Sequence, residues 1–471
     1  MTTPFLPLVS RREMLRRTAL SFGSLGLAGT MQAAGLLGSA EAATSASASP
    51  LSAKTHFPPR AKRVIYLFMN GAPSHVDTFD PKPGLKEHEG EQPPGDSGRK
   101  KKGGFMASPF AFAPQGKSGV VMSELFPNLA RCADDLCVIR SMYTDVPNHE
   151  PGLLLMHSGN QQPIRPSMGS WISYGLGTEN QNLPAFVVLA PRKPVIGPFL
   201  WSNSFLPGAH QGVAVDTNDM QVDKLVTNLR HPTLDRAQQR QQLDLLAELN
   251  RRHLAERPGD AALEAQIQAM ETAFQMQTEA AEAFDISREP EALRETYGKT
   301  VFGQQCLLAR RLCEYGVRYV HVYYLYKDSN QPWDTHSNND DGHRKLCKDA
   351  DQATAALLTD LKQRGLLEDT LVVWGGEFGR TPMSEGSDGR DHNPHGFCMW
   401  LAGGGVKGGQ VIGATDDIGL RAAEGKAHAH DVQATILHLL GLNHLRLTYR
   451  HNGRNERLTD NGGEVIEKVL A

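Results

Sequence analysis

The stretch "TLVVWGGEFGRTPMSEGSDGRDHNPHGFCMWLA", residues 370–402, contains two short apolar runs that are separated by a glycine-rich segment. The apolar runs, Thr370–Trp374 and Phe397–Ala402, are typical of strands that are buried on both faces. The segment between them is rich in Glu, Asp and His side chains, which are common metal ligands. Its glycines allow the backbone to approach a ligand closely. We therefore interpret the segment as a loop that presents ligands between two strands.

Apolar runs of this kind recur along the chain and alternate with helical patterns. Leu346, Leu357 and Leu361 belong to an apolar repeat with spacings of three and four, and a second helix is predicted from Asp431 to Gly441. This alternation predicts an α/β fold with three layers, α/β/α, around a mostly parallel central sheet. The other predicted strands are Arg63–Met69, Leu136–Met142, Ala185–Ala190 and Val317–Leu325.

Residues 219–314 interrupt the alternation, because nearly all of this segment has helical patterns. Leu263, Ile267, Met270 and Phe274 form one apolar stripe. One interpretation is a helical insertion that packs on the sheet domain, and the other is a cap over an active site. Amphipathic helices are ordinarily structural, which favours the insertion.

The first 42 residues have the features of an export signal. The pair Arg11–Arg12 precedes a weakly apolar stretch rich in Gly, Ala and Ser, and "AEA" at Ala40–Ala42 fits a signal peptidase site. We expect residues 1–42 to be a twin-arginine signal peptide, residues 43–60 a disordered lead-in and residues 61–471 the folded domain. The signal predicts the twin-arginine export machinery as a partner, a periplasmic or secreted location, and no stable membrane span in the mature chain.

The composition fits a soluble globular protein and argues against several function classes. Lys and Arg number 49 against 52 Asp and Glu, so the net charge of -3 gives no reason to expect nucleic acid as a partner. Six cysteines do not make a dense disulfide framework in a chain of this size, although Cys132 and Cys137 are close enough in sequence to pair. The sequence contains no C-x-x-C pair, which argues against a thiolate zinc site.

Polar clusters follow four of the predicted strands, and each cluster includes His and a carboxylate. The carboxyl ends of parallel strands share one edge of a sheet, where the ligands of α/β proteins gather. A buried carboxylate without a partner is strongly unfavourable unless it becomes neutral, and a divalent metal removes this difficulty. The candidates are Asn70 and Asp77 after the first strand, Thr144, Asn148 and His149 after the second, Asp334 and His336 after the fourth, and Glu377, His392 and His395 after the fifth.

Asp334 and His336 are only two residues apart. In an extended segment their side chains point to the same side, so the pair can chelate one ion. A set that mixes carboxylates and imidazoles favours zinc over calcium, with manganese or iron as alternatives. The cofactor that we expect is therefore a divalent metal.

Several blocks of the sequence resemble one known family. The blocks "FMNGAPSHVDTFDPKP", "TDVPNHEPG", "WDTHSNN", "GGEFGRTP", "GRDHNPHGF" and "HDVQATILHLLGL" are similar to an uncharacterised secreted bacterial family, domain of unknown function 1501. That family is placed beside the sulfatases in the alkaline phosphatase superfamily. The resemblance covers about Arg63 to Leu442, and it implies an alkaline phosphatase-like fold and metal-dependent ester hydrolysis.

The resemblance also implies a metal site in which two ligand positions are altered. Asn70 stands where the superfamily has a metal-binding Asp, and Phe378 stands where it has a His. Asp77 and His392 are candidates to replace these two ligands. The remaining implied ligands are Asp334, His336, Glu377 and His395.

The block "TDVPNHEPG" resembles the nucleophile block of phosphodiesterases. Thr144 is then the nearest hydroxyl, and Ser141 is the second. Asn148 would bind the substrate oxyanion, and Asp145 or His149 would act as the base if water attacks. The alternative is that Thr144 only caps the helix that follows.

Three functions agree with these observations. The first is an exported metal-dependent hydrolase of phosphate or related anionic esters, whose substrate is a small molecule or a glycan. The second is a sulfatase-like hydrolase of sulfated glycans without formylglycine, because the one matching frame, "QQPIR" at Gln161–Arg165, begins with a residue that cannot be converted. The third is a non-catalytic exported protein, which the altered positions Asn70 and Phe378 favour and the four polar clusters oppose.

Overall fold

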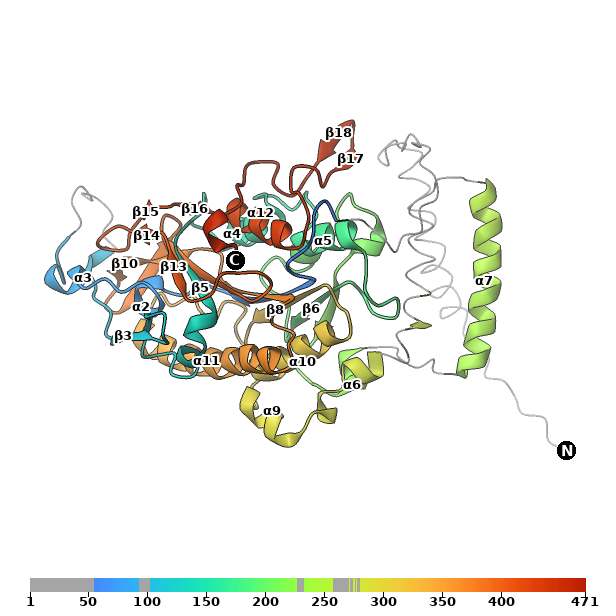
Figure 1. The fold of residues 1–471 in the computed structure, drawn as a ribbon, viewed down its shortest axis with the longest axis horizontal. Helices are drawn as coiled ribbons and strands as arrows, with labels where there is room; N and C mark the ends of the chain where they lie inside the picture. The colour runs from blue at the N-terminus through green and yellow to red at the C-terminus, as the bar shows by residue number, and fades with distance from the viewer. Residues whose placement is uncertain are drawn as a thin grey trace, which may run out of the picture. The chain divides into compact units, whose positions relative to one another are not determined.

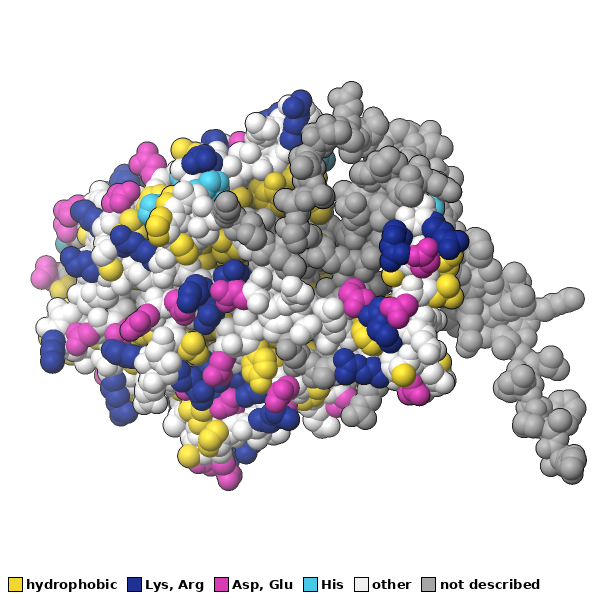
Figure 2. Space-filling view, turned by 45° about the vertical axis from the view of Figure 1, so that its right-hand side comes forward, with side chains coloured by type: hydrophobic (Ala, Val, Ile, Leu, Met, Phe, Trp, Pro, Cys, Tyr) yellow, Lys and Arg dark blue, Asp and Glu magenta, His cyan; other side chains and the backbone are white. Residues whose placement is uncertain are grey.

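The computed structural model describes residues 55–92, 102–226, 233–256 and 280–471, together with scattered positions between 271 and 277. The predicted signal peptide, residues 1–42, and most of the lead-in lie outside the described residues. Within them, no helix combines the length and the apolar character that a membrane span requires. Figure 2 shows side chains of both charges interspersed over the described part of one face, as the small net charge leads us to expect.

A large central sheet organises the chain, and all six predicted strands are part of it. The strand order is β13-β5-β12-β9-β1-β8-β6-β7, with β16 paired to β5. β12 is antiparallel to both of its neighbours, and the other described pairs of this sheet are parallel, so the expected mostly parallel α/β fold is confirmed. Its strands are β1 (Arg63–Met69), β5 (Leu136–Tyr143), β6 (Phe186–Ala190), β7 (Val213–Asp216), β8 (Tyr319–Tyr324), β9 (Thr370–Gly375), β12 (Phe397–Ala402), β13 (Gln410–Ile412) and β16 (Ala427–His428).

Helices cover both faces of this sheet (Figure 1). Residues Ile65 and Leu67 of β1 belong to the apolar cluster that includes α10 and α11, whereas Val64 and Phe68 belong to the cluster that includes α4, α5 and α12. Successive residues of a strand point to opposite faces, so β1 separates two apolar layers. The helices are α4 (His149–Ser158), α5 (Met168–Leu176), α10 (Val301–Glu314), α11 (Asn339–Gln363) and α12 (Ala429–Leu439).

Shorter elements surround this core. A three-stranded sheet contains β2 (Lys102–Phe105), β10 (Gly379–Glu385) and β11 (Gly389–Asn393), and small antiparallel pairs join β3 (Phe112–Gln115) to β4 (Val120–Ser123) and β14 (Ala414–Thr415) to β15 (Ala422–Glu424). The remaining elements are α2 (His75–Thr78), α3 (Gly84–Glu87), β17 (Tyr449–His451), β18 (Arg454–Glu456) and 3-10 turns at Leu129–Asp135, Gly197–Trp201, Gly208–His210, Ile286–Arg288 and Glu467–Val469.

The segment between β9 and β12 forms a hairpin, whereas the sequence indicated a loop. Its strands β10 and β11 pair with Gly379 opposite Asn393 and Arg380 opposite His392. Gly386 has a φ of +62°, which a glycine adopts without strain, and it lies where the chain turns back. The pairing places Arg380 and His392 side by side.

The segment at 219–314 contains helices and no strand among its described residues. They are α6 (Val222–Leu225), α7 (Arg236–Glu256), α9 (Glu291–Tyr297) and α10. Leu307 and Leu308 of α10 are buried in the same cluster as the central strands, so this helix belongs to the layer that covers the sheet. Residues 55–60, from the expected lead-in, are irregular, and the His56 N–H donates to the Gly441 carbonyl at 2.8 Å.

All six cysteines are buried and free. Cys132 and Cys137 therefore do not form the disulfide that their spacing permits. Burial raises the pKa of the Cys137 thiol to about 12, so this group is held as a neutral apolar side chain.

Two buried histidines meet where α4 packs on β8, His157 from the helix and His321 from the strand. The Nδ1–H of His157 donates to the Leu153 carbonyl at 2.6 Å, which leaves its Nε2 to accept from the Tyr323 hydroxyl at 2.7 Å. The two Nε2 atoms of His157 and His321 lie 3.1 Å apart, and the Tyr319 hydroxyl lies 3.1 Å from His321 Nδ1. Every one of these bonds can be made by neutral imidazoles. Burial lowers the pKa of His157 to about 4 and the pKa of His321 well below its usual range.

This buried pair predicts a loss of stability in mild acid. A histidine whose folded pKa is lowered stays neutral in the folded chain and gains a proton on unfolding, so its contribution is complete above pH 6.5 and declines below it. His157 alone lowers the free energy of unfolding by about 2 kcal/mol between pH 6.5 and pH 5. Urea denaturation at both pH values measures this change. A His157→Met variant with an equally large decline would contradict the prediction.

Candidate metal centre

Four side chains from three parts of the fold meet at the carboxyl edge of the central sheet. Asp334 and His336 lie in the segment after β8, His392 lies in β11, and His149 is the first residue of α4. One ligand atom from each of these residues lies within 4.8 Å of the others, and all four side chains are partly buried. We call this group the metal centre.

Three imidazoles converge on one carboxylate oxygen in the metal centre. Asp334 Oδ1 lies 2.9 Å from His336 Nε2 and 3.2 Å from the Nε2 atoms of both His149 and His392. The Nε2 atoms of His336 and His392 are 3.0 Å apart. The same ring nitrogen of each histidine thus faces the same point.

The other nitrogen of each ring has its own partner. His149 Nδ1 bonds to Glu377 Oε1 at 2.6 Å, His392 Nδ1 bonds to the Pro147 carbonyl at 2.6 Å, and His336 Nδ1 bonds to a carboxylate oxygen of Glu385. An acceptor at Nδ1 holds the proton there and leaves the Nε2 lone pair available. Metal-binding histidines are oriented in this way in many proteins.

Two glycines allow the backbone to close around the metal centre. A Cβ at Gly71, whose φ is +103°, would lie 2.5 Å from the backbone nitrogen of Asp334. A Cβ at Gly389 would lie 1.8 Å from the carbonyl oxygen of His336. Any larger residue at these positions would push away the segment that carries Asp334 and His336.

Arg380 balances the charge of Asp334. Its guanidinium is fully buried and contacts Asp334 Oδ1, and it also donates to the Ala72 carbonyl at 3.1 Å and to the Gly71 carbonyl. Burial alone would raise the pKa of Asp334, but its hydrogen bonds to the three histidines, together with the permanent charge of Arg380, hold that pKa well below its usual range and keep the carboxylate ionised.

The ionisation of the histidines depends on these carboxylates. Burial alone would lower the pKa of His149, but its hydrogen bonds to Asp334 and Glu377 outweigh burial and raise the pKa to about 9. The hydrogen bond to Asp334 raises the pKa of His336, against a smaller opposing effect of burial. Without an ion the imidazoles of His149 and His336 therefore tend to hold protons, which a metal would displace.

Glu377 lies behind the metal centre rather than in it. Its side chain is fully buried, and Oε1 bonds to both His149 Nδ1 and the Gly71 N–H, the latter at 3.0 Å. Its other oxygen has no hydrogen-bond partner within the described part of the chain. The sequence suggested Glu377 as a direct ligand, which stays a prediction; in the structure its Oε1 bonds to His149, and Glu377 is not among the four converging residues.

Asn70 and Asp77 also lie outside the group of four. The side chain of Asn70 is fully buried, and neither of its polar atoms has a partner among the residues that the structure describes. Asp77 forms a buried ion pair with Arg390, with an Nε–Oδ2 distance of 2.7 Å, and accepts from Asn339 at 3.0 Å. Asp77 is therefore already neutralised by an arginine and does not replace Asn70 as a ligand.

His395 is exposed and does not join the metal centre. It follows β11, where its N–H bonds to Asn393 Oδ1 at 3.1 Å. His392, three residues earlier, lies within the paired strand opposite Arg380 and so reaches Asp334. Of the two histidines in this stretch, only His392 is brought to the site.

The predicted catalytic residues lie along the segment that leads from β5 to α4. Thr144 is buried, its N–H donates to the Pro394 carbonyl at 2.8 Å, and its hydroxyl has no partner in the described ranges. Asn148 is the exposed N-cap residue of α4, so Thr144 does not cap this helix. His149, which the sequence suggested as a base, is instead one of the four converging groups.

Sequence reasoning did not identify Arg380 or Glu385 as part of the site. Both lie in the stretch 370–402, but neither belongs to a recognisable ligand pattern. Glu385 ends β10, and together with His336 and Asp391 it forms a second group of possible metal ligands that shares His336 with the metal centre. The register of the β10–β11 hairpin, which the sequence does not show, brings both residues to the site.

Three imidazoles and one carboxylate make a donor set that fits a divalent transition metal. Zinc prefers four ligands of this kind at about 2.0–2.2 Å, and the four groups already face a common point. His149, Asp334, His336 and His392 would hold the ion, while Glu377, Glu385 and the Pro147 carbonyl would orient the rings. This set differs from the predicted one by the gain of His149 and the loss of Glu377, His395, Asp77 and Asn70.

The fold and the metal centre define a three-layer α/β protein with a histidine-rich site at the carboxyl edge of its sheet. The chain belongs to the family described as "Protein of unknown function (DUF1501)", whose model matches residues 61–470. This confirms the resemblance found in the sequence. No curated protein matches the chain.

Several solved structures are similar to this chain at low sequence identity. The PsFucS1 sulfatase from Pseudoalteromonas sp. is 14% identical, with coverage of 81% of this chain and 68% of that chain and a TM-score of 0.33. The lipoteichoic acid synthase LtaP from Listeria monocytogenes is 9% identical, with coverage of 89% and 80% and a TM-score of 0.37. The phosphonate monoester hydrolase SpPMH from Silicibacter pomeroyi is 11% identical, with coverage of 73% and 71% and a TM-score of 0.33.

The geometry predicts which histidines hold a metal. Replacing His149 or His336 with Ala removes one of four converging donors, so zinc affinity should fall at least roughly tenfold, since even the loss of an outer-shell partner has an effect of that size. His395→Ala is the matched control and should keep the affinity of the parent protein. Zinc titration against a competing chelator measures all three variants. Loss of zinc in His395→Ala, with retention in the other two, would contradict this ligand set.

Proposed function

We propose that the protein is a metal-dependent hydrolase of phosphate or related anionic esters. The observation that carries the proposal is the convergence of three imidazole Nε2 atoms on the Asp334 carboxylate. A bound divalent ion would supply Lewis-acid chemistry and polarise an ester oxygen. A site built only for stability has little need to leave four ligand groups partly exposed at a sheet edge.

The residues around the metal centre are suited to anionic chemistry. Arg380 carries a permanent positive charge at Asp334, and Glu377 holds the ring of His149 in one orientation. The segment from Thr144 to His149 contacts the centre, because the Pro147 carbonyl bonds to His392 and His149 is one of the four converging residues. These groups would position an ester and hold the ligands still while the bond breaks.

Thr144 is the hydroxyl that we propose as the nucleophile. It lies directly after β5, it is buried, and its hydroxyl is not committed to a hydrogen bond within the described residues. Ser141, the other candidate, donates to the Gly425 carbonyl at 2.6 Å and so already has a structural partner. Asn148, which is exposed at the start of α4, is the residue that we propose to contact a substrate oxygen.

Sulfuric esters are a second class of substrate, and their hydrolysis here would not use formylglycine. Gln161 begins a frame that resembles the modified motif, and it cannot be converted to formylglycine. Arg165 of this frame pairs with Glu456 at 2.6 Å and with Asp460 at 3.0 Å, and therefore has a structural role. We expect the protein to prefer phosphate esters. Comparing its turnover of a phosphate ester and a sulfate ester separates the two classes.

The place of action is also a proposal. The paired Arg11–Arg12 and the Ala40–Ala42 site favour export through the twin-arginine machinery and a periplasmic or secreted protein. Zinc is the metal that this donor set favours, and manganese or iron are alternatives.

A substrate assay tests the function and the nucleophile together. The zinc-loaded protein should hydrolyse p-nitrophenyl phosphate, and His149→Ala should be inactive because it lacks a ligand. Thr144→Ala should lose activity by several orders of magnitude if this hydroxyl attacks, with its zinc content and melting temperature unchanged. Ser141→Ala is the matched control and should remain active.

The outcomes separate the alternatives. A fully active Thr144→Ala variant would exclude Thr144 and make water the attacking group. Faster turnover of p-nitrophenyl sulfate would select the sulfatase class. A zinc-loaded protein that turns over neither ester would favour the non-catalytic interpretation.

A further inference from the structure

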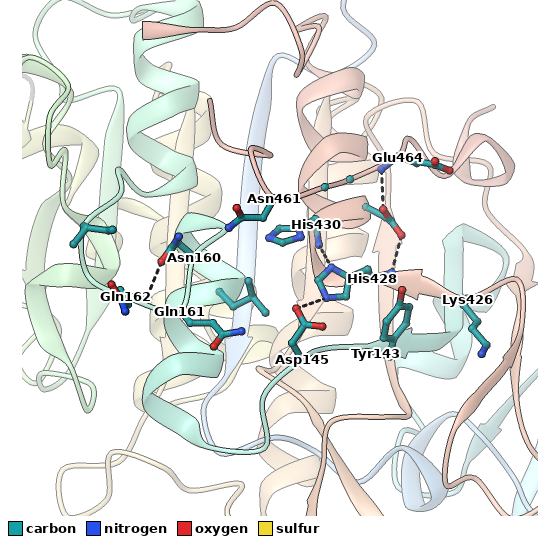
Figure 3. Close-up of a pocket in the computed structure, with 15 residues that line it drawn as sticks. Tyr143, Asp145, Asn160, Gln161, Gln162, Lys426, His428, His430, Asn461 and Glu464 are labelled. Carbon is teal, nitrogen blue, oxygen red and sulfur yellow. Dashed lines mark hydrogen bonds and ion pairs between the residues drawn. The ribbon is translucent and has the colours of Figure 1, made fainter. Parts of the chain in front are cut away.

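A cavity of about 890 Å³ is lined in part by Tyr143 and Asp145, which lie in the segment that leads to His149 of the metal centre. Figure 3 shows Asn160, Gln161 and Gln162 on one side of it, and Asp145, His428 and Tyr143 on the other. Its volume is within the usual range for small-ligand sites. The four metal-centre residues do not line it.

Two of the carboxylates that line this cavity already have partners within the protein. Asp145 Oδ2 bonds to His428 Nε2 at 3.2 Å. Asp431 accepts from the backbone N–H groups of His428 and Glu464 at 2.7 and 2.8 Å. Lys426 and the Glu464 side chain then add one charge of each sign. With three carboxylates against one lysine, the walls do not favour a phosphate or sulfate group.

The remaining polar groups suit a ligand rich in hydroxyls. Asn160, Gln161, Gln162 and Asn461 each offer an amide that can both donate and accept, as a hydroxyl can. The lining of the cavity also includes apolar surface. Ile164 is 56% exposed, and the ring of Tyr143 lies 5.0 Å from the ring of His428. Sugars present hydroxyls at their edges and C–H groups on their faces, which matches both features.

The walls of the cavity are fixed before any ligand arrives. The Gln162 N–H donates to Asn160 Oδ1 at 2.8 Å, which shapes the turn that presents the glutamines. The Gly159 carbonyl accepts from His430 Nε2 at 3.0 Å and from Asn461 Nδ2 at 3.3 Å, which joins the two sides. Pre-formed walls reduce the ordering that binding would otherwise require.

The cavity and the metal centre are joined by one short segment. Tyr143 ends β5, Asp145 lines the cavity, and the Pro147 carbonyl contacts His392 of the metal centre. Asp145 and Pro147 are two residues apart, so their Cα atoms are at most about 7 Å from each other. This separation is short enough for one substrate to contact both the metal centre and the cavity.

We infer that this cavity binds a neutral, hydroxyl-rich carbohydrate, which makes the substrate an anionic ester of a glycan. The inference rests on the proposed function for the ester, while the carbohydrate site itself is independent of catalysis. Gln161 and Gln162 are its specificity residues, and they come from the same frame that cannot form formylglycine.

Binding to an array that carries neutral, sulfated and phosphorylated glycans tests this site. The purified protein should bind at least one glycan through its neutral part. Calorimetry with that glycan should show roughly thirtyfold weaker binding for Gln161→Ala/Gln162→Ala, since each of the two lost hydrogen bonds contributes about 1 kcal/mol. Gln181→Ala, an exposed amide outside the cavity, is the matched control and should bind normally.

A metal-centre variant separates this inference from the proposed function. His336→Ala should lose zinc and ester hydrolysis but keep glycan binding, because His336 does not line the cavity. Absence of binding to any neutral glycan, or equal binding by the double glutamine variant, would overturn the inference. Glycan binding without hydrolysis of any ester would instead overturn only the proposed function.

Discussion

The carboxylate of Asp334 is the constraint on which the rest of the site depends. One negative charge lies at the edge of the sheet, largely shielded from water, and needs several partners there. A guanidinium from β10 and imidazoles from α4, the segment after β8, and β11 provide them. Each of these elements is therefore held to the sheet by the same charge. A divalent ion among the rings would strengthen this arrangement without changing which elements meet.

The outer partners matter as much as the inner ones. Glu377 was expected to bind metal directly because it follows β9 at the right edge. The Gly71 N–H and His149 Nδ1 both bond to its Oε1, so it acts one layer further out. Through this hydrogen bond Glu377 raises the pKa of His149 and holds its ring in one orientation. A carboxylate that bound the ion directly could not do this. The carboxylate is thus used to control an imidazole rather than an ion.

The sequence predicted the framework well because the signals for it are local. The six apolar runs became strands of the central sheet, and Asp334 and His336 were found together because a two-residue spacing fixes their side. Other assignments depended on long-range geometry. His149 bonds to Glu377 across 228 positions of the chain, and no local pattern in the sequence shows this contact.

Long-range geometry also explains why the structure brings His392, and not His395, to the metal centre. The two histidines are three residues apart in a glycine-rich stretch, and the sequence favoured the second by resemblance. The register of the β10–β11 hairpin decides between them, because it pairs His392 with Arg380. A change of one residue in that register would move the imidazole to the other face of the hairpin. No local pattern in the stretch reveals the register.

The segment from Tyr143 to His149 connects the two sites of the molecule and is tied at four points. The Thr144 N–H bonds to Pro394, the Asp145 carboxylate to His428, the Pro147 carbonyl to His392, and the His149 ring to Glu377. Two of these ties reach the metal centre, and one reaches the wall of the cavity. A ligand that displaces the Asp145–His428 contact would therefore act on the chain only four residues from His149. This one segment therefore contributes Asp145 to the cavity wall and His149 to the metal centre.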